Sequence, residues 1–277
     1  MKLSIITATH HRPNLLASCA APSILTQLDH CFEWVVVNDG QDIPTRQIVN
    51  QLQTDIKIRY IEISHCKTGF GLCHSRNIAL QEASGDIVAY LDDDNQLAPS
   101  FSADTKMFFK QQPSVRCLIP KQIRRRNIVG HGQLLKKGKS FVSPEPNTTI
   151  WDFVVQKALF DSNGFTHYKD NAPQWNLGFK IFCDYEYFLS CLNQWGMKSF
   201  SIASNANVFY TQTSEGIIGQ STYQEWADEL SRICDYSFNY SAINEEVLTT
   251  LKAVVTRWRR KQTQHNSIAA FSSQKVR

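Results

Sequence analysis

Three consecutive carboxylates follow a short apolar run at residues 87–91. The run is apolar at every position, as in an inner strand covered on both faces, and Asp92, Asp93 and Asp94 come directly after it. Adjacent carboxylates repel one another unless a cation lies among them. A hard divalent ion prefers oxygen ligands and keeps open positions for phosphate groups. The triplet therefore predicts a metal-diphosphate site at a strand end, and a solvated acidic turn is the alternative for a lone triplet.

The triplet is one of several polar signals at the ends of apolar segments. Asp39 and Gly40 follow an apolar run at residues 32–37, and Asp184 opens a helical pattern after a polar loop. A carboxylate at a helix start is favoured by the helix dipole alone, which is the structural alternative for Asp184.

Four strands are predicted to position these groups, at residues 3–8, 32–37, 56–63 and 87–91. Helical segments separate them, and the third begins near Gly69 and Gly71 and runs to Ala83. This alternation predicts an α/β fold with a right-handed, mainly parallel sheet. Open sheets of this kind bind ligands at the carboxyl ends of their strands. Asp39 and the triplet should therefore meet at one edge.

The rest of the chain predicts covering elements and a helical end. We expect a helix over residues 101–112, a strand over 115–119 and short strands at 200–202 and 208–210. The basic stretch 121–139 is either a solvated loop or hairpin, or a phosphate-facing wall beside the active site. Thr222 and Glu225 form a capping-box pattern before two apolar helical stripes, of which the second ends in cations. A frayed tail is expected after Gln262.

Composition excludes several classes of protein. The 277 residues are 42% hydrophobic, which allows a sizeable core, and the net charge of +4 is too mild for a dedicated nucleic-acid binder. The eight cysteines form no Cys-x-x-Cys pair, so we expect reduced thiols. The apolar core near the start of the sequence, residues 3–8, is too short for a signal peptide, and no window is apolar enough to span a bilayer. We therefore predict a cytoplasmic protein.

Five segments resemble, in order, the motifs of the family 2 glycosyltransferases, which have the GT-A fold. They are the opening strand at residues 3–7, the V-N-D-G segment at 37–40, the glycine and S-R-N at 71–77, the D-D-D-N motif at 91–95 and the C-D-Y-E segment at 183–186. Thr7, Asn38 and Cys183 depart from the family pattern. The resemblance covers about residues 1–215, with 1–120 as the nucleotide-sugar part and 121–215 as the acceptor side. Residues 216–277 form a helical extension with a basic tail.

The resemblance implies transfer of a sugar from a nucleotide diphosphate, UDP-linked by default, to a hydroxyl acceptor with inversion. Surface polysaccharide or glycolipid synthesis is the implied setting, with a saccharide or lipid-linked saccharide as acceptor. The implied contacts of the nucleotide base are Asp39 and the main chain of Thr7, Ala8 and Thr9, with Arg76 nearby. Asp93 would lie near the ribose, Asp92 and Asp94 would hold Mg²⁺ or Mn²⁺ at the diphosphate, and Asp184 would be the catalytic base.

Physical chemistry supports this division of roles. A metal stabilises the charge that builds on the leaving diphosphate, and one carboxylate near the acceptor hydroxyl can take its proton. Glu186 is a rival base, but it lies about 200° round the helix from Asp184, so both cannot face one cleft.

Other interpretations remain open at this stage. Trp175 either stacks on an acceptor sugar or packs in the core, and His65, Cys66, Cys73 and His74 resemble a zinc quartet only if all four converge. The basic C-terminal helix, with Trp258 among its arginines, either contacts an anionic membrane at its inner face or packs on the catalytic domain.

Two other classes of function are also weighed. A sugar-nucleotide-forming nucleotidyltransferase would need a glycine-rich loop after the first strand, and residues 7–11 contain no glycine. A non-catalytic sugar-nucleotide-binding partner subunit would not need the intact triplet and Asp184.

Overall fold

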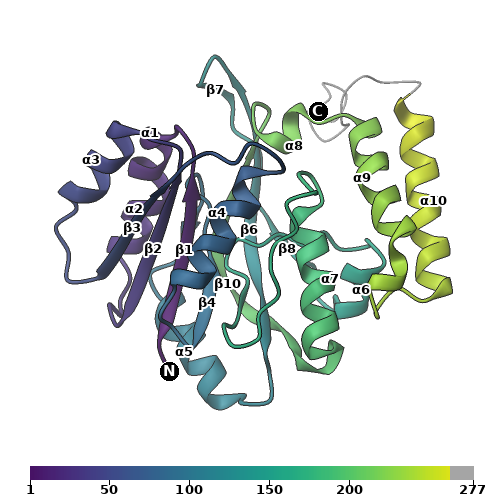
Figure 1. Ribbon diagram of the computed structural model, residues 1–277, viewed down its shortest axis with the longest axis horizontal. Coiled ribbons are helices and arrows are strands. Elements are labelled where there is room, and N and C mark those ends of the chain that lie inside the picture. Colours follow the sequence, from purple (N-terminus) through teal and green to yellow (C-terminus); the bar gives the residue numbers. More distant parts are fainter. Residues whose placement is uncertain (263–277) are drawn as a thin grey trace.

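One curled, ten-stranded sheet organises the chain, in the order β3-β2-β1-β4-β9-β6-β10-β5, with β7 and β8 paired to β6 (Figure 1). The computed structural model describes residues 1–262, so the tail predicted after Gln262 lies outside the described residues. The strands are β1 Leu3–Thr9, β2 Phe32–Asp39, β3 Lys57–Ile63, β4 Ile87–Tyr90, β5 Gln96–Leu97, β6 Cys117–Gly130, β7 Gln133–Lys136, β8 Phe141–Ser143, β9 Thr166–Tyr168 and β10 Phe200–Thr213.

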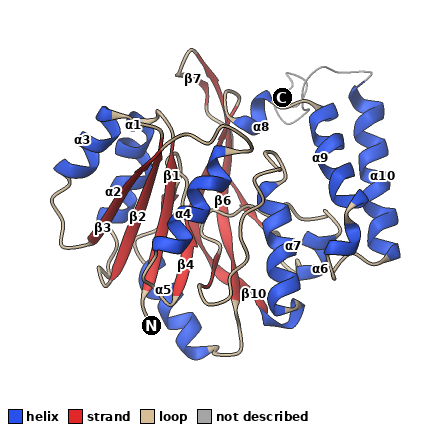
Figure 2. Cartoon of the chain, in the orientation of Figure 1, coloured by secondary structure: helices blue, strands red, loops and turns tan. Residues whose placement is uncertain are grey.

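Helices cover both faces of the sheet (Figure 2). They are α1 Pro13–Leu15, the π-helix η1 Leu16–Ala20, α2 Ala21–Leu25, α3 Ile43–Gln51, α4 Gly71–Glu82, α5 Phe101–Gln111, α6 Ile150–Val154, α7 Cys183–Trp195, η2 Met197–Ser199, α8 Ile217–Gln220, α9 Tyr223–Asp235, η3 Ser237–Asn239 and α10 Glu245–Gln262.

Strands β3, β2, β1 and β4 are mutually parallel, as predicted. β1, β2 and β4 are buried along their whole length because both of their faces are apolar. Helix α4 packs on the face that carries Ile6 and Val37, and α2, α3 and α5 pack on the face that carries Ile5 and Trp34. The carboxyl ends of β1, β2 and β4 therefore lie along one edge, which positions the site.

The second half of the sheet differs from the prediction. The strand expected to end at residue 119 continues to Gly130, so the basic stretch begins as strand β6 and turns back as β7. The two short strands expected after residue 200 form the single strand β10, which pairs with β6 through register shifts between Ile202 and Val208. Those shifts break the apolar alternation, which is why the sequence suggested two strands.

The C-terminal helices pack on α7 and its surroundings. Helices α9 and α10 share one apolar cluster with α7, and the Trp226 and Trp258 rings lie 5.3 Å apart, with Phe182 5.8 Å from Trp258. The predicted capping box is confirmed, since Thr222 and Glu225 bond to each other's main chain. Trp258 is therefore used for packing. Within the described part of the chain, no helix has the length and apolarity needed to cross a bilayer.

Candidate active site

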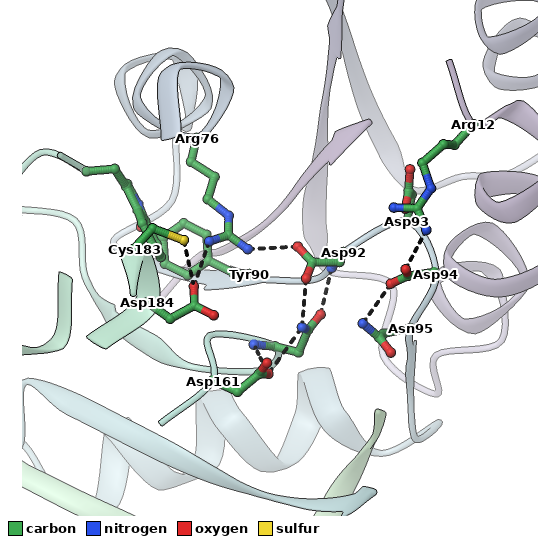
Figure 3. Close-up of polar contacts among 12 residues, drawn as sticks. Arg12, Arg76, Tyr90, Asp92, Asp93, Asp94, Asn95, Asp161, Cys183 and Asp184 are labelled. Carbon is green, nitrogen blue, oxygen red and sulfur yellow. Dashed lines mark hydrogen bonds and ion pairs between the residues drawn. The ribbon is translucent and has the colours of Figure 1, made fainter. Parts of the chain in front are cut away.

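Asp92 is the first carboxylate after β4 and is held from two sides (Figure 3). Its main-chain N–H donates to Oδ1 of Asn163 over 2.7 Å, and Nδ2 of Asn163 donates to Oδ2 of Asp92 over 2.9 Å. On the other side, Nη2 of Arg76 donates to Oδ1 of Asp92 over 2.7 Å. These contacts fix the Asp92 carboxylate before any ligand binds.

Asp93 and Asp94 share one cation, Arg12, which follows β1. Nη1 of Arg12 lies 2.9 Å from Oδ1 of Asp93, and Nη2 bonds Asp94, while Thr9 donates to Oδ2 of Asp93 over 2.7 Å. Burial raises the pKa of Asp93 to about 7, with Arg12 opposing and Asp94 adding to the shift. Burial also raises the pKa of Asp94, again against Arg12. Burial therefore makes the ionised forms of Asp93 and Asp94 less stable than those of exposed carboxylates, despite the neighbouring Arg12.

Arg76 joins the triplet to Asp184. Its guanidinium is 2% exposed, donates from Nη1 to Oδ1 of Asp184 over 2.9 Å, and lies 4.3 Å from the centroid of the Trp175 ring. Burial alone would lower the pKa of Arg76, but Asp92 and Asp184 together raise it well above its ordinary value. Asp92 and Asp184, which lie 92 positions apart in the chain, are therefore the two partners of one buried cation.

Asp184 is the second residue of α7 and its side chain is 24% exposed. Burial raises its pKa to about 6, partly offset by Arg76, so the carboxylate is ionised near neutral pH and is a stronger base than an ordinary aspartate. Glu186 is directed elsewhere: it is 4% exposed and accepts from Ser190 over 3.1 Å and Tyr240 over 3.0 Å. The predicted separation of the two carboxylates is confirmed.

The start of α7 is held by the C-terminal helices. Glu229 of α9 accepts hydrogen bonds from the successive main-chain N–H groups of Lys180, Ile181 and Phe182, at 2.8–3.2 Å. These amides precede the helix, and a carboxylate is favoured beside a helix N-terminus. The C-terminal extension thereby contributes to the position of Asp184.

Asp39 ends β2 and lies among histidines. It is 4% exposed, its Oδ2 is 2.8 Å from Nδ1 of His65, and the main-chain oxygen of Asp39 accepts from Nδ1 of His10. A Cβ at Gly71 would collide with the Asp39 carboxylate, which explains the glycine at the start of α4. The carboxyl ends of β1, β2 and β4 thus carry the two acidic groups, Asp39 and the triplet, at one edge.

The side chains of Thr7 and Arg76 have protein partners, which leaves the predicted contact of Thr7 with the nucleotide to its main chain. Thr7 has no exposed surface and its hydroxyl accepts the indole N–H of Trp34 over 2.9 Å, so its side chain supports β1 instead of facing the edge. Arg76 has a carboxylate at each end of its guanidinium, between the triplet and Asp184. Ala8 and Thr9 lie where β1 reaches the edge, and Thr9 bonds Asp93.

The structure decides between two pairs of alternatives that the sequence left open. Trp175 is 1% exposed and stacks on Tyr187 with ring centroids 3.9 Å apart, so it packs in the core and has no face for a sugar. The zinc quartet does not converge, because Cys73 is buried with its Sγ 3.8 Å from the main-chain oxygen of Phe179 while His65 faces Asp39.

Sequence reasoning missed four polar residues that shape the site: Arg12, Asp161, Asn163 and Glu229. Arg12 carried a usable signal, because a cation directly after the first strand reaches the same edge as the triplet. Asn163 and Asp161 carried none, since they lie about 70 residues from Asp92 in an irregular segment. Asp161 bonds Asn163 and Gln122 and so holds the amide that fixes Asp92.

Comparisons with known proteins assign the class. The sequence profile described as "Glycosyl transferase family 2" matches residues 4–181. The chain is 36% identical over 97 residues to the GalNAc(5)-diNAcBac-PP-undecaprenol beta-1,3-glucosyltransferase of Campylobacter jejuni, covering 35% of this chain and 30% of that protein. It is 32% identical over 98 residues to the hyaluronan synthase of Pasteurella multocida, covering 35% of this chain and 10% of that protein. The chain thus spans less than a third of the length of these relatives.

Two solved structures share the fold. TarS 1–349 of S. aureus in complex with UDP-GlcNAc superposes with a TM-score of 0.66 at 17% identity, over 100% of this chain and 76% of that chain. The mannosyltransferase PcManGT of Pyrobaculum calidifontis, in complex with GDP-Man and Mn²⁺, superposes with a TM-score of 0.61 at 12% identity, over 97% of this chain and 76% of that chain.

The mostly parallel sheet, with carboxylates gathered at its edge, is therefore the GT-A fold of a glycosyltransferase. The chain belongs to glycosyl transferase family 2.

Proposed function

We propose that this enzyme transfers a sugar from a UDP-linked donor to a hydroxyl of a saccharide or lipid-linked saccharide, with inversion at the anomeric carbon. The observation that carries the proposal is the Arg76 bridge, which places Asp92 of the triplet and Asp184 of α7 on the same buried guanidinium. The UDP-GlcNAc and UDP complexes of TarS support a UDP-linked donor. The named relatives support surface polysaccharide or glycolipid synthesis.

We assign Asp92 and Asp94 as the residues that would hold a divalent cation. The donors are all carboxylate oxygens, which suit Mg²⁺ or Mn²⁺, and the neighbouring Arg12 guanidinium shows that the triplet attracts positive charge. When bound, such an ion would stabilise negative charge on the leaving diphosphate. The Mn²⁺ complex of PcManGT supports this assignment.

Asp184 is the proposed base. As the acceptor oxygen attacks the anomeric carbon, Asp184 takes the hydroxyl proton, the new C–O bond forms, and the bond to the diphosphate oxygen breaks with its electron pair. One in-line displacement inverts the carbon, so a single base suffices. Asp39 and the main chain at Ala8 and Thr9 would contact the nucleobase, and Asp93 would lie near the ribose.

Arg76 has a positioning role in this scheme. Its two hydrogen bonds fix Asp92 and Asp184 relative to each other, which lowers the cost of aligning donor and acceptor. Residues 1–215 would supply the catalytic domain, and the described part of the C-terminal extension, residues 216–262, would support it. The cations Arg257 and Arg259, near the end of α10, would make a peripheral contact with anionic lipid.

The test is product analysis with candidate UDP-sugars. A thermal-shift screen of nucleoside diphosphates, with and without Mn²⁺, first identifies the nucleotide, since a ligand raises the melting temperature with its occupancy. The identified donor is then incubated with acceptor saccharides, and NMR of the product gives the anomeric configuration. Absence of both transfer and donor hydrolysis would contradict the proposal, and a retained configuration would contradict inversion. Failure of the protein to float with anionic liposomes would contradict the lipid contact.

A further inference from the structure

Two histidines and a carboxylate meet at the ends of three neighbouring strands. β3, β2 and β1 lie side by side and parallel (Figure 1). Thr9 of β1 lies opposite Asn38 of β2, so His10 follows opposite Asp39, and His65 comes two residues after β3 ends. The order of the strands, more than any local motif, brings these three residues together.

The three side chains are close enough to share an ion. Each offers one nitrogen or oxygen ligand atom, and these atoms all lie within 4.8 Å of one another. Nδ1 of His65 is 2.8 Å from Oδ2 of Asp39. Two ligands of a tetrahedral ion with bonds of about 2.0–2.1 Å lie about 3.3 Å apart, so these two atoms are within about half an ångström of ligand spacing. Because Nδ1 of His10 donates to the main-chain oxygen of Asp39, Nε2 is the nitrogen of His10 that remains for an ion.

The surroundings orient these groups as in a ligand set. Nδ1 of His10 bonds the main-chain oxygen of Asp39, and a ligating histidine commonly uses its second nitrogen in this way. Oδ1 of Asp39 is buried and receives no hydrogen bond from the residues that the structure describes. The His10 and His65 rings stack with centroids 4.9 Å apart, and both side chains are about half exposed. A metal ion can therefore reach the two histidines from solvent, and Oδ1 of Asp39 has no hydrogen-bond donor among the described residues to stabilise its charge.

We propose that His10, Asp39 and His65 form a second cation site, which takes a borderline transition metal such as Zn²⁺. Imidazole nitrogens favour Zn²⁺ over Mg²⁺, so this site differs in chemistry from the all-carboxylate pair Asp92 and Asp94. Three protein ligands leave a coordination position open to water or to a ligand.

The site has a consequence for the donor, which rests on the proposed function. If Asp39 contacts the nucleobase, an ion on Asp39 and the nucleotide exclude each other. Zn²⁺ at ten times its dissociation constant would then weaken UDP binding about tenfold.

The test is direct metal binding. Co²⁺ is titrated into the full chain and its visible absorption recorded, and Zn²⁺ affinity is measured by calorimetry. The wild type is expected to bind one equivalent at this site, and His10→Ala and His65→Ala are each expected to lose at least about tenfold in affinity. Both side chains are half exposed, so folding should persist, and circular dichroism checks it.

His30→Ala is the matched control. Nδ1 of His30 lies 2.6 Å from Asp55, but this pair has no third ligand among the described residues. The metal affinity of this variant should therefore equal that of the wild type. Asp94→Asn and Cys66→Ser should also keep the Co²⁺ spectrum, which separates this site from the triplet and from a thiol. Unchanged affinity in both ligand variants, or loss of the spectrum in Asp94→Asn or Cys66→Ser, would overturn the proposal. Zn²⁺ binding that leaves UDP affinity unaltered would instead refute the placement of the nucleobase at Asp39.

Discussion

Replacement of Asp184 by asparagine removes the proposed base while the side chains that hold it stay in place. Asparagine keeps the size of the side chain and an oxygen that can accept from Arg76, but it cannot take a proton. A positioned general base contributes about 10²- to 10⁴-fold. We expect kcat of Asp184→Asn to fall by that factor, which corresponds to about 3–5 kcal/mol of activation free energy.

The pH profile gives a second readout of the same group. Burial raises the pKa of Asp184 from 3.8 to about 6, and the base works only when deprotonated. The wild-type rate should therefore be level above about pH 6 and fall about tenfold for each pH unit below it. Because the folded pKa lies above the unfolded value, lowering the pH through this range favours the folded state at this group. Loss of rate there is then not explained by unfolding driven through Asp184.

The assay is initial-rate transfer across pH for the wild type, Asp184→Asn and the control Glu186→Gln. Glu186 lies on the same helix but bonds Ser190 and Tyr240, so its variant should retain most of the activity and the same pH profile. An Asp184→Asn enzyme that keeps more than about a tenth of the wild-type kcat would refute the assignment. So would a comparable loss in Glu186→Gln.

Three further predictions test the framework. EDTA should abolish transfer and added Mn²⁺ restore it, whereas full activity in EDTA would exclude the metal role of Asp92 and Asp94. Arg76→Met should lower the free energy of unfolding by about 3–5 kcal/mol in urea denaturation, because two carboxylates lose their buried partner, and a loss below about 1 kcal/mol would contradict the bridge. Glu229→Gln should cost about 1–3 kcal/mol, since three main-chain donors lose a charged acceptor, and an unchanged midpoint would show that the contact is dispensable.

Several elements could be predicted because their signals are local. Of the four parallel strands, β1, β2 and β4 are largely apolar segments and β3 alternates polar and apolar residues, and the capping box at Thr222 and Glu225 is a short pattern with its own physical cause. The strand ends then follow from the parallel arrangement, which is why Asp39 and the triplet could be placed at one edge.

Other elements could not be predicted from the sequence, because contacts between residues far apart in the chain determine them. β6 continues past residue 119 because β10 and β8 pair with it, and its Arg124 is buried over the Tyr210 ring, 5.2 Å from the centroid. A charged residue inside a strand predicts exposure, so the pattern suggested a solvated loop or hairpin, and the structure has the hairpin of β6 and β7. Trp175 was equally ambiguous, since a loop tryptophan is compatible with a sugar platform until Tyr187 is seen stacked on it.

The sequence by itself determined the α/β class of the fold and the edge at which the acidic groups gather, and the resemblance of residues 183–186 to a family motif made Asp184 a candidate base. The fold class and the edge could be predicted because the alternation of strands and helices, and the residues that follow each strand, are local properties of the sequence. Only the tertiary structure decided that Arg76 joins Asp92 to Asp184, that Arg12 covers Asp93 and Asp94, and that His10 and His65 close on Asp39. Those pairings depend on side chains brought within about 3–5 Å by strand order and helix packing, and sequence spacing carries no record of such distances.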